Sequence, residues 1–168
     1  KECEFIGKAG WLAVKVYPPQ DGVLSFDQPQ DNILNPWYWL YQPVAYSLNG
    51  RMGTRAQYRN MVKECRKHNV LVYNDMVVNH MSGGGNDVLE HCNGGNFWGP
   101  KESFTGSPYY TMGFTNGVDK YTGKINTAEF PASAYGPLHF HCERSLNSWS
   151  DGFIMNAGYL SGLLDLNT

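Results

Sequence analysis

An acid, an amide and an imidazole stand close together in the middle of the chain, at Asp75, Asn79 and His80. They follow an apolar run, residues 70–73, that predicts a buried strand. In a parallel sheet covered by helices, active sites lie at the carboxyl ends of the strands. The spacing therefore predicts that these three side chains belong to a functional site. The alternative is a polar strand end whose side chains only cap their own backbone.

A second carboxylate stands inside an apolar run, Leu163-Leu164-Asp165-Leu166. The flanking leucines predict that Asp165 is buried, and a buried carboxylate needs a cation or several hydrogen-bond donors. With the oxygen of Asn79, backbone carbonyls and water, it would suit Ca²⁺, which takes about 6–8 oxygen ligands. The alternative is that Asp165 caps a helix beginning at residues 166–168. His139 and His141 have metal-like spacing on a predicted strand, but two histidines alone are a weak signal.

A cluster of aromatic side chains precedes an amide, at Trp37, Tyr38, Trp39, Tyr41 and Gln42. Flat rings can stack on the apolar face of a sugar, and an amide can pair with sugar hydroxyls. The whole chain is 14% aromatic and only 17% charged, against about 25% charged in an average soluble domain. This composition suits a sugar-binding surface. The alternative is that the rings pack against the sheet or form a large aromatic core.

The elements that would position these residues alternate between strand and helix. Residues 11–17 predict a buried strand that ends at Pro18 and Pro19, because proline removes backbone donors. Residues 18–53 predict a long loop. Thr54 and Gln57 have the spacing of a capping box, and apolar residues three or four apart predict an amphipathic helix to about residue 69. The following strand completes a strand-helix-strand order, which implies a parallel sheet covered by helices.

Beyond His80 the sequence becomes rich in Gly, Asn, Ser, Thr and Pro, which predicts an irregular, loop-rich subdomain. The four cysteines have no zinc-site spacing and allow two disulfides in three pairings. They are Cys3, Cys65, Cys92 and Cys142. Sequential pairing would give each half of the chain one disulfide in an oxidising compartment. The alternative is four reduced thiols in the core of a cytosolic protein.

Charge and length exclude several classes of function. The net charge is −2 and the basic residues are scattered singly, so we expect neither a nucleic-acid partner nor a membrane surface. No apolar run reaches the length of about 18 residues of a membrane span, and the first residues lack the apolar region of a signal peptide. The 168 residues suit one domain and fall short of the roughly 250 of a complete eight-stranded α/β barrel.

Taken in order, these motifs resemble the α-amylase family of glycoside hydrolases, close to the animal and protist enzymes. The matching segments are Glu2-Cys3-Glu4, the GxxxVxVxPP strand of residues 10–19, Pro36-Trp37 to Val44, the helix with Met61-Val62 and Cys65, Tyr73 to His80, and Gly162 to Leu166. The agreement spans nearly the whole chain and is weakest between residues 82 and 135. The resemblance implies an α/β fold, namely part of a (β/α)8 barrel with a domain B inserted after the third strand.

The resemblance also implies domain boundaries and a disulfide. Residues 1–80 would run from the end of the first barrel helix to the third strand, residues 81–163 would form domain B, and residues 164–168 would return to the barrel. The pair Cys3 and Cys65 is similar to a family disulfide, so the resemblance favours the sequential pairing, in which Cys92 joins Cys142. The remainder of the same polypeptide would be needed to complete the barrel.

The resemblance assigns roles to single residues. The expected substrate-binding residues are Trp37, Tyr38, Tyr41, Gln42, His80, Trp149 and Leu163. His80 would support the transition state at the cleavage subsite, while Asp75 would be a buried organiser of the cleft floor. The expected calcium ligands are Asn79, Asp165 and the backbone carbonyl of Asn156. Where the family binds chloride, its ligands would lie outside this chain. Tyr38 replaces a Trp common in animal enzymes, which predicts weaker stacking there.

The implied function is retaining endo-cleavage of α-1,4-glucosidic bonds in starch or glycogen by a calcium-dependent enzyme, secreted or in a vacuolar or lysosomal lumen. A retaining glycosidase needs two carboxyl groups about 5–5.5 Å apart. In the family these come from strands four and five, beyond Thr168, so the chain alone should be inactive. It should also be unstable alone, because two strands of a parallel barrel leave sheet edges unpaired and strand faces uncovered. The alternatives are a non-catalytic homologue that binds glycan or forms part of an assembly, and a transglycosylating relative.

Overall fold

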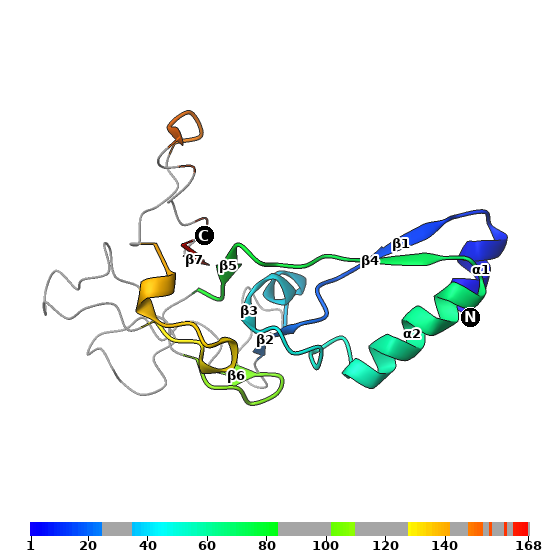
Figure 1. Cartoon of the computed structure of the whole chain (residues 1–168), viewed down its shortest axis with the longest axis horizontal. Coiled ribbons are helices and arrows are strands. Elements are labelled where there is room, and N and C mark those ends of the chain that lie inside the picture. Colours follow the sequence, from blue (N-terminus) through cyan, green and yellow to red (C-terminus); the bar gives the residue numbers. More distant parts are fainter. Residues whose placement is uncertain are drawn as a thin grey trace, which may run out of the picture.

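The structure is a computed structural model (Figure 1) that describes residues 1–24, 35–83, 102–109, 128–141, 148–152, 155, 160 and 163–167. Cys92, Cys142 and Asn156 lie outside the described residues, so the second disulfide and the third calcium ligand stay predictions. The elements in chain order are α1 (Glu2–Lys8), β1 (Ala13–Val16), β2 (Asp21–Leu24), the 3₁₀ helix η1 (Trp37–Tyr41), β3 (Pro43–Ala45), α2 (Arg55–Lys67), β4 (Leu71–Asn74), β5 (His80–Met81), β6 (Glu102–Ser103), the 3₁₀ helices η2 (Pro131–Ser133) and η3 (Pro137–His139), and β7 (Leu164–Asp165).

The predicted parallel pair is present, because β1 and β4 run side by side with Ala13 opposite Leu71 and Val16 opposite Asn74. In Figure 1 α2 lies along one side of this pair. The Tyr58 hydroxyl on α2 donates to the Asn74 side chain, which fixes the face that the helix covers. The strand-helix-strand prediction is therefore confirmed.

The expectation that these strands are buried is wrong for the chain as it stands. Leu71 and Tyr73 are 53% and 59% exposed, and Trp11 and Leu12 are also exposed. The physical reason is that the described chain supplies a helical layer on one face of the pair only. Parallel sheets are normally covered on both faces, so the opposite face of β1 and β4 remains open.

Helix α2 begins where the sequence predicts. The Gln57 backbone N–H donates to the Thr54 hydroxyl oxygen at 3.3 Å, and the Thr54 backbone N–H donates to the Gln57 side-chain oxygen at 2.8 Å. This reciprocal pair satisfies two backbone donors that the first turn leaves unpaired. At the other end Asn69 takes a left-handed conformation with φ 59°, after which the chain turns into β4.

Residues 18–53 do not form one long loop. They contribute β2, η1 and β3, and the antiparallel sheet has the order β3-β2-β6. Asp21 on β2 is fully buried, and its carboxylate accepts from the Thr105 backbone N–H at 3.3 Å. The carboxylate thereby anchors the segment after β6 to β2. The strands are only two to four residues long, which is shorter than the window in which alternation can be recognised.

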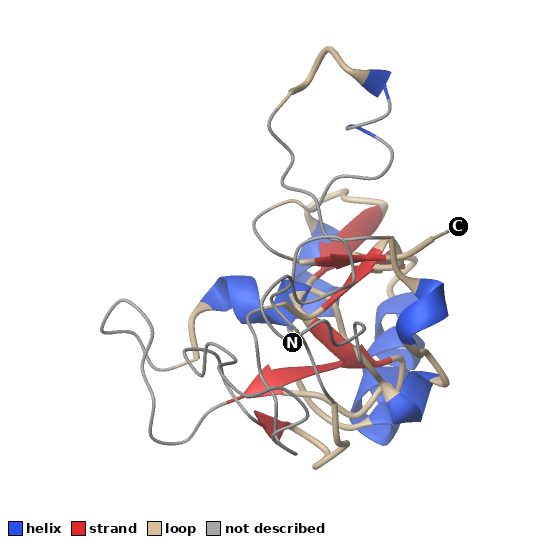
Figure 2. Ribbon diagram, turned by 90° about the vertical axis from the view of Figure 1, so that its left-hand side faces the viewer, coloured by secondary structure: helices blue, strands red, loops and turns tan. Residues whose placement is uncertain are grey.

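The hydrophobic core lies away from β1 and β4. Its buried members are Val23, Trp39, Val44, Met81, Tyr109, Ala128, Phe130, Phe140, Leu164 and Leu166. They come from β2, η1, β3 and the described residues beyond 80, where the strands are short and the helices are 3₁₀ turns. Figure 2 shows the molecule coloured by secondary structure from this side. The Tyr109 and Phe130 rings stack at a centroid distance of 5.9 Å. The described residues beyond 80 therefore pack on the chain between β1 and α2.

An antiparallel pair brings the last described residues back to the middle of the chain. His80 on β5 lies opposite Asp165 on β7, and Met81 lies opposite Leu164. The alternative helix start at residues 166–168 is wrong for its described part, because Leu166 bridges to Phe140 instead. The predicted strand at residues 139–141 is also wrong, since His139 ends the 3₁₀ helix η3.

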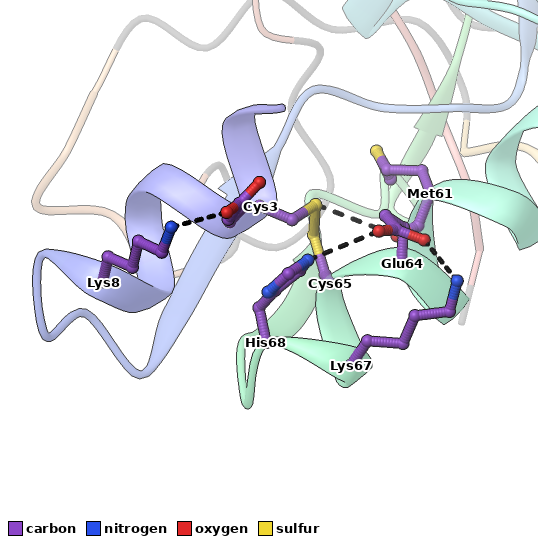
Figure 3. A network of polar contacts seen from close by, with 8 residues as sticks. Cys3, Lys8, Met61, Glu64, Cys65, Lys67 and His68 are labelled. Atoms are coloured by element: carbon purple, nitrogen blue, oxygen red, sulfur yellow. Dashed lines mark hydrogen bonds and ion pairs between the residues drawn. A yellow bond between two sulfur atoms is a disulfide. The ribbon is translucent and has the colours of Figure 1, made fainter.

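The disulfide between Cys3 and Cys65 is present, with the two Cα atoms 4.7 Å apart (Figure 3). It joins α1 to α2 across a sequence separation of 62. Beside it Glu64 accepts from the Lys67 ammonium at 2.7 Å. None of the helices in the described ranges is both long and apolar enough to cross a membrane.

Removing this disulfide from the full-length natural protein should lower the free energy of unfolding. The double variant Cys3→Ala with Cys65→Ala frees a loop of this length in the unfolded chain, which should cost about 2–5 kcal/mol. Denaturant melts of the variant and the wild type measure the difference. Lys67→Met, which loses only a surface ion pair, serves as the control. Identical midpoints for double variant and wild type would contradict the expectation.

Candidate functional site

A cavity of about 450 Å³ is lined by residues that the sequence predicts to bind sugar. They are Trp37, Tyr38, Tyr41, Gln42 and Leu163. The Trp37 ring meets the Tyr38 ring edge to face at 5.8 Å and the Tyr41 ring at 6.0 Å. The structure therefore brings together five of the seven predicted substrate-binding residues, four of them on or beside η1.

The turn of the 3₁₀ helix η1 directs some rings of the aromatic cluster into the core and others toward the cavity. Trp39 is 2% exposed and packs in the core, whereas Trp37 is 63% exposed. The core therefore takes one of the rings, as the packing alternative anticipated, and the others face the cavity. The guanidinium of Arg51 donates to the carbonyls of Asn35 at 2.7 Å and Pro36 at 3.2 Å. These two bonds fix the backbone where η1 begins, and burial lowers the pKa of Arg51.

A second cavity, of about 180 Å³, adjoins the first. Its lining residues are Asn79, His80, Trp149, Met155, Leu160, Leu163 and Asp165. Leu163 lines both cavities. The β5 and β7 pairing produces this arrangement, because the Leu166 backbone N–H donates to the Asn79 carbonyl at 2.9 Å. The sequence analysis missed Met155 and Leu160 as site residues, since an isolated apolar residue in a loop carries no signal of its own.

The His80 imidazole is held at both nitrogens. Its Nε2 lies 2.9 Å from the Tyr41 carbonyl and its Nδ1 lies 2.9 Å from the Asn79 amide nitrogen. A carbonyl only accepts and an amide NH₂ only donates, so this pattern corresponds to the tautomer protonated at Nε2. Burial lowers the pKa of His80. The ring is therefore kept neutral in one orientation beside the aromatic wall, which is formed by the rings of Trp37, Tyr38 and Tyr41 that line the first cavity.

Asp75 lies between the aromatic wall and β1. The Tyr41 hydroxyl donates to its Oδ2 at 2.7 Å, and the Lys15 Nζ lies 3.1 Å from the same oxygen. The hydrogen bond from Tyr41, followed by that from Lys15, lowers the pKa of Asp75. The expectation of a buried carboxylate is wrong, because the Asp75 side chain is half-buried. The sequence analysis missed Lys15 as a site residue, although a lysine inside the otherwise apolar run of β1 is a visible exception to the pattern.

Asn79 and Asp165 line the same cavity, so the two side chains expected to share a cation lie beside it together. The Asp165 Oδ2 accepts from the His141 Nδ1 at 2.8 Å. Asp165 is half-buried, not buried. Within the described ranges no group of three or more His, Cys, Asp or Glu side chains could hold a metal ion. His139 turns away to Gly136, whose backbone N–H donates to its Nδ1 at 3.0 Å, so the two histidines form no metal pair.

Comparisons with known proteins point to a single family. The chain is 29% identical to the pancreatic α-amylase of Rattus norvegicus over 170 residues, which cover 99% of the chain and 28% of the relative. It is 33% identical to the α-amylase of Pecten maximus over 132 residues, covering 77% of the chain and 24% of the relative. No family model matches the chain. The chain thus spans about a quarter of the length of these relatives.

The fold agrees with the sequence comparison. A crystal structure of a variant of α-amylase I from Eisenia fetida, in complex with maltohexaose, superimposes with a TM-score of 0.72 at 26% identity. The match covers 99% of the chain and 28% of that structure. The β1, α2 and β4 unit accordingly forms part of an α-amylase barrel fold. Over almost its whole length, this chain is related to the α-amylases of glycoside hydrolase family 13.

Proposed function

We propose that the natural protein containing this chain is a retaining α-amylase that cleaves internal α-1,4-glucosidic bonds in starch or glycogen. The observation that carries the proposal is the convergence of the predicted sugar-binding side chains on two adjoining cavities. The relationship to α-amylases, one of which is seen with maltohexaose, supports it. The nucleophile and the general acid would come from other parts of the protein, so this chain alone is expected to be inactive.

The aromatic wall would bind the glucan by stacking. Trp37 and Tyr41 stand edge to face, so a sugar ring lying on one of them meets the side of the other. Tyr38 and Gln42 line the same cavity, and the amide of Gln42 would pair with hydroxyl groups. This arrangement favours a chain of sugar units over a single charged ligand, because the described part of the lining offers flat apolar faces and no ionised group.

His80 would steady the sugar at the point of cleavage. Its neutral ring lies between the aromatic wall and the second cavity, where Trp149 and Leu163 would contact the same glucan. A sugar hydroxyl that binds at Nε2 would replace the Tyr41 carbonyl as acceptor. This hydrogen bond would hold the sugar in the distorted shape that the transition state requires, and would lower the barrier by positioning the reacting unit.

The pair Asn79 and Asp165 would hold Ca²⁺ together with the backbone carbonyl of Asn156. These ligands fit Ca²⁺. The Asn79 amide nitrogen faces His80, so the amide oxygen would serve as the ligand, and Asp165 offers a carboxylate beside the same cavity. Ca²⁺ prefers such oxygen ligands. When bound, the ion would tie β7 and the preceding loop to the start of β5. Its contribution would be structural, holding the two cavities together.

The remaining assignments concern the whole protein. We propose residues 1–80 as part of the barrel, 81–163 as domain B and 164–168 as the return to the barrel, with further barrel strands covering the open face of β1 and β4. Without that cover this chain alone should be unstable. The disulfide between Cys3 and Cys65 supports an oxidising location, either secreted or in a vacuolar or lysosomal lumen.

The full-length natural protein should hydrolyse soluble starch from within. Internal cleavage should lower the viscosity of a starch solution long before the reducing ends approach their final number. NMR of the first products should show the α-anomer, because two displacements at carbon 1 retain its configuration. A protein that binds maltohexaose without releasing shorter sugars would be the non-catalytic homologue, and one that forms longer chains would be the transglycosylating relative.

Trp37→Ala should weaken binding of maltohexaose about 3- to 10-fold, the range expected for loss of one aromatic contact. Trp37→Phe keeps a ring at this position and should lose less. Calorimetry on the full-length protein measures both affinities, and Lys67→Met on α2 is the control. Equal affinities for Trp37→Ala and the wild type would show that the exposed ring is not part of the glucan site.

Chelation should lower the melting temperature of the full-length protein, and added Ca²⁺ should restore it. Saturation at about 100 times the dissociation constant would contribute about 2.7 kcal/mol. Asp165→Asn and Asn79→Ala should each abolish or weaken this response, whereas Glu64→Gln on α2 should keep it. A wild-type melting temperature that ignores both chelator and Ca²⁺ would remove the basis for the ion site.

A further inference from the structure

Lys15 stands on the open face of the parallel pair. It is the third residue of β1 and lies opposite Tyr73 of β4 in the strand register. Its neighbour Val16 lines a cavity together with Tyr58 and Met61 of α2, so the alternation of a strand turns Lys15 to the other face. A cation therefore sits on the face that lacks a helical layer.

The contacts of Lys15 lead from this face to the aromatic wall. Its Nζ and the Tyr41 hydroxyl approach the same oxygen of Asp75, at 3.1 Å and 2.7 Å. The Asp75 backbone N–H donates to the Val16 carbonyl at 3.1 Å, which fixes the carboxylate at the end of β1. These residues line a cavity of about 230 Å³ together with Tyr17, whose ring meets the Tyr41 ring edge to face at 6.4 Å.

The charges around Asp75 make Lys15 its particular partner. The groups that face the carboxylate are Lys15 from β1 and Tyr41 from η1, with Tyr17 beside Tyr41. Among the described residues Lys15 is the cation that forms an ion pair with Asp75. Neighbours of Lys15 on the same face, such as Leu71, are apolar. Once that face is covered, an unpaired charge of either sign would be costly, so each of the two requires the other.

We propose that Lys15 is a positioning residue for glucan binding: it holds the Asp75 carboxylate, which in turn holds the hydroxyl and ring of Tyr41 in the sugar-binding wall. This inference rests on the proposed glucan-binding function. The pKa of Asp75, lowered by the hydrogen bond from Tyr41 and then by Lys15, agrees with it. Because the folded pKa lies below the ordinary value, the link persists at neutral pH and is lost as pH falls through that lowered pKa.

The test uses the full-length natural protein with Lys15→Met, which removes the charge, and Lys15→Arg, which keeps it. Lys67→Met is the matched control, because Lys67 is as exposed as Lys15 and also pairs with a carboxylate. Lys15→Met should weaken maltohexaose binding about 3-fold, within the range for a partly exposed ion pair. The acid limb of binding should move to higher pH. Lys15→Arg should restore both, and Lys67→Met should change neither.

A second measurement separates this inference from the proposed function. NMR titration of the labelled Asp75 carboxyl should show a higher pKa in Lys15→Met than in the wild type. An unchanged pKa, or unchanged maltohexaose affinity and pH profile in Lys15→Met, would overturn the inference while leaving the glucan site standing. If the wild type binds no maltohexaose, the proposed function fails and the role of Lys15 in sugar binding fails with it, even where the titration shows that Lys15 controls Asp75.

Discussion

The short antiparallel pair between β5 and β7 is the constraint on which the site depends. It consists of two residues on each strand, with His80 opposite Asp165, and one further bond from the Leu166 N–H to the Asn79 carbonyl. Without it the end of the chain would have no reason to approach the end of β4. With it, Leu163 lies where the two cavities meet. Buried Met81 and Leu164 place this pairing in the core, so apolar packing supports bonds that are too few to stand alone.

The chain distributes its apolar surface unevenly, and this follows from the kind of sheet it contains. A parallel pair needs layers on both faces, and α2 supplies one. The residues beyond 80 instead make a core with β2 and β3, centred on rings such as Trp39 and Phe130. The disulfide to Cys65 and the capping box at Thr54 then stabilise the helical layer from its two ends. The site lies where the open sheet meets this core.

Local signals in the sequence predicted the elements that local interactions build. The Thr54 to Gln57 spacing predicted the start of α2, and the resemblance predicted the Cys3 and Cys65 pair. The proximity of Trp37, Tyr38 and Tyr41 at one cavity could also be predicted, since they adjoin in sequence, while their binding of sugar stays a prediction. Strands β2, β3 and β6 were missed because each is too short for alternation to be visible. Burial was mispredicted at Leu71, because an apolar side chain is buried only where another layer packs on it, and no described residues cover this face of the sheet.

Tyr41 explains why the parts of the site behave as one unit. Its carbonyl accepts from His80, its hydroxyl donates to Asp75, and its ring meets Trp37 edge to face. A rotation that improved one of these contacts would lengthen the others, so the imidazole, the carboxylate and the wall are fixed by the same backbone. No sequence pattern could report this, because the three partners come from different elements and only the fold brings them to one tyrosine. Apart from the His80 Nε2–H, which a sugar hydroxyl would take over from the Tyr41 carbonyl, a sugar entering the cavity therefore meets side chains that are already oriented, and this lowers the ordering cost of binding.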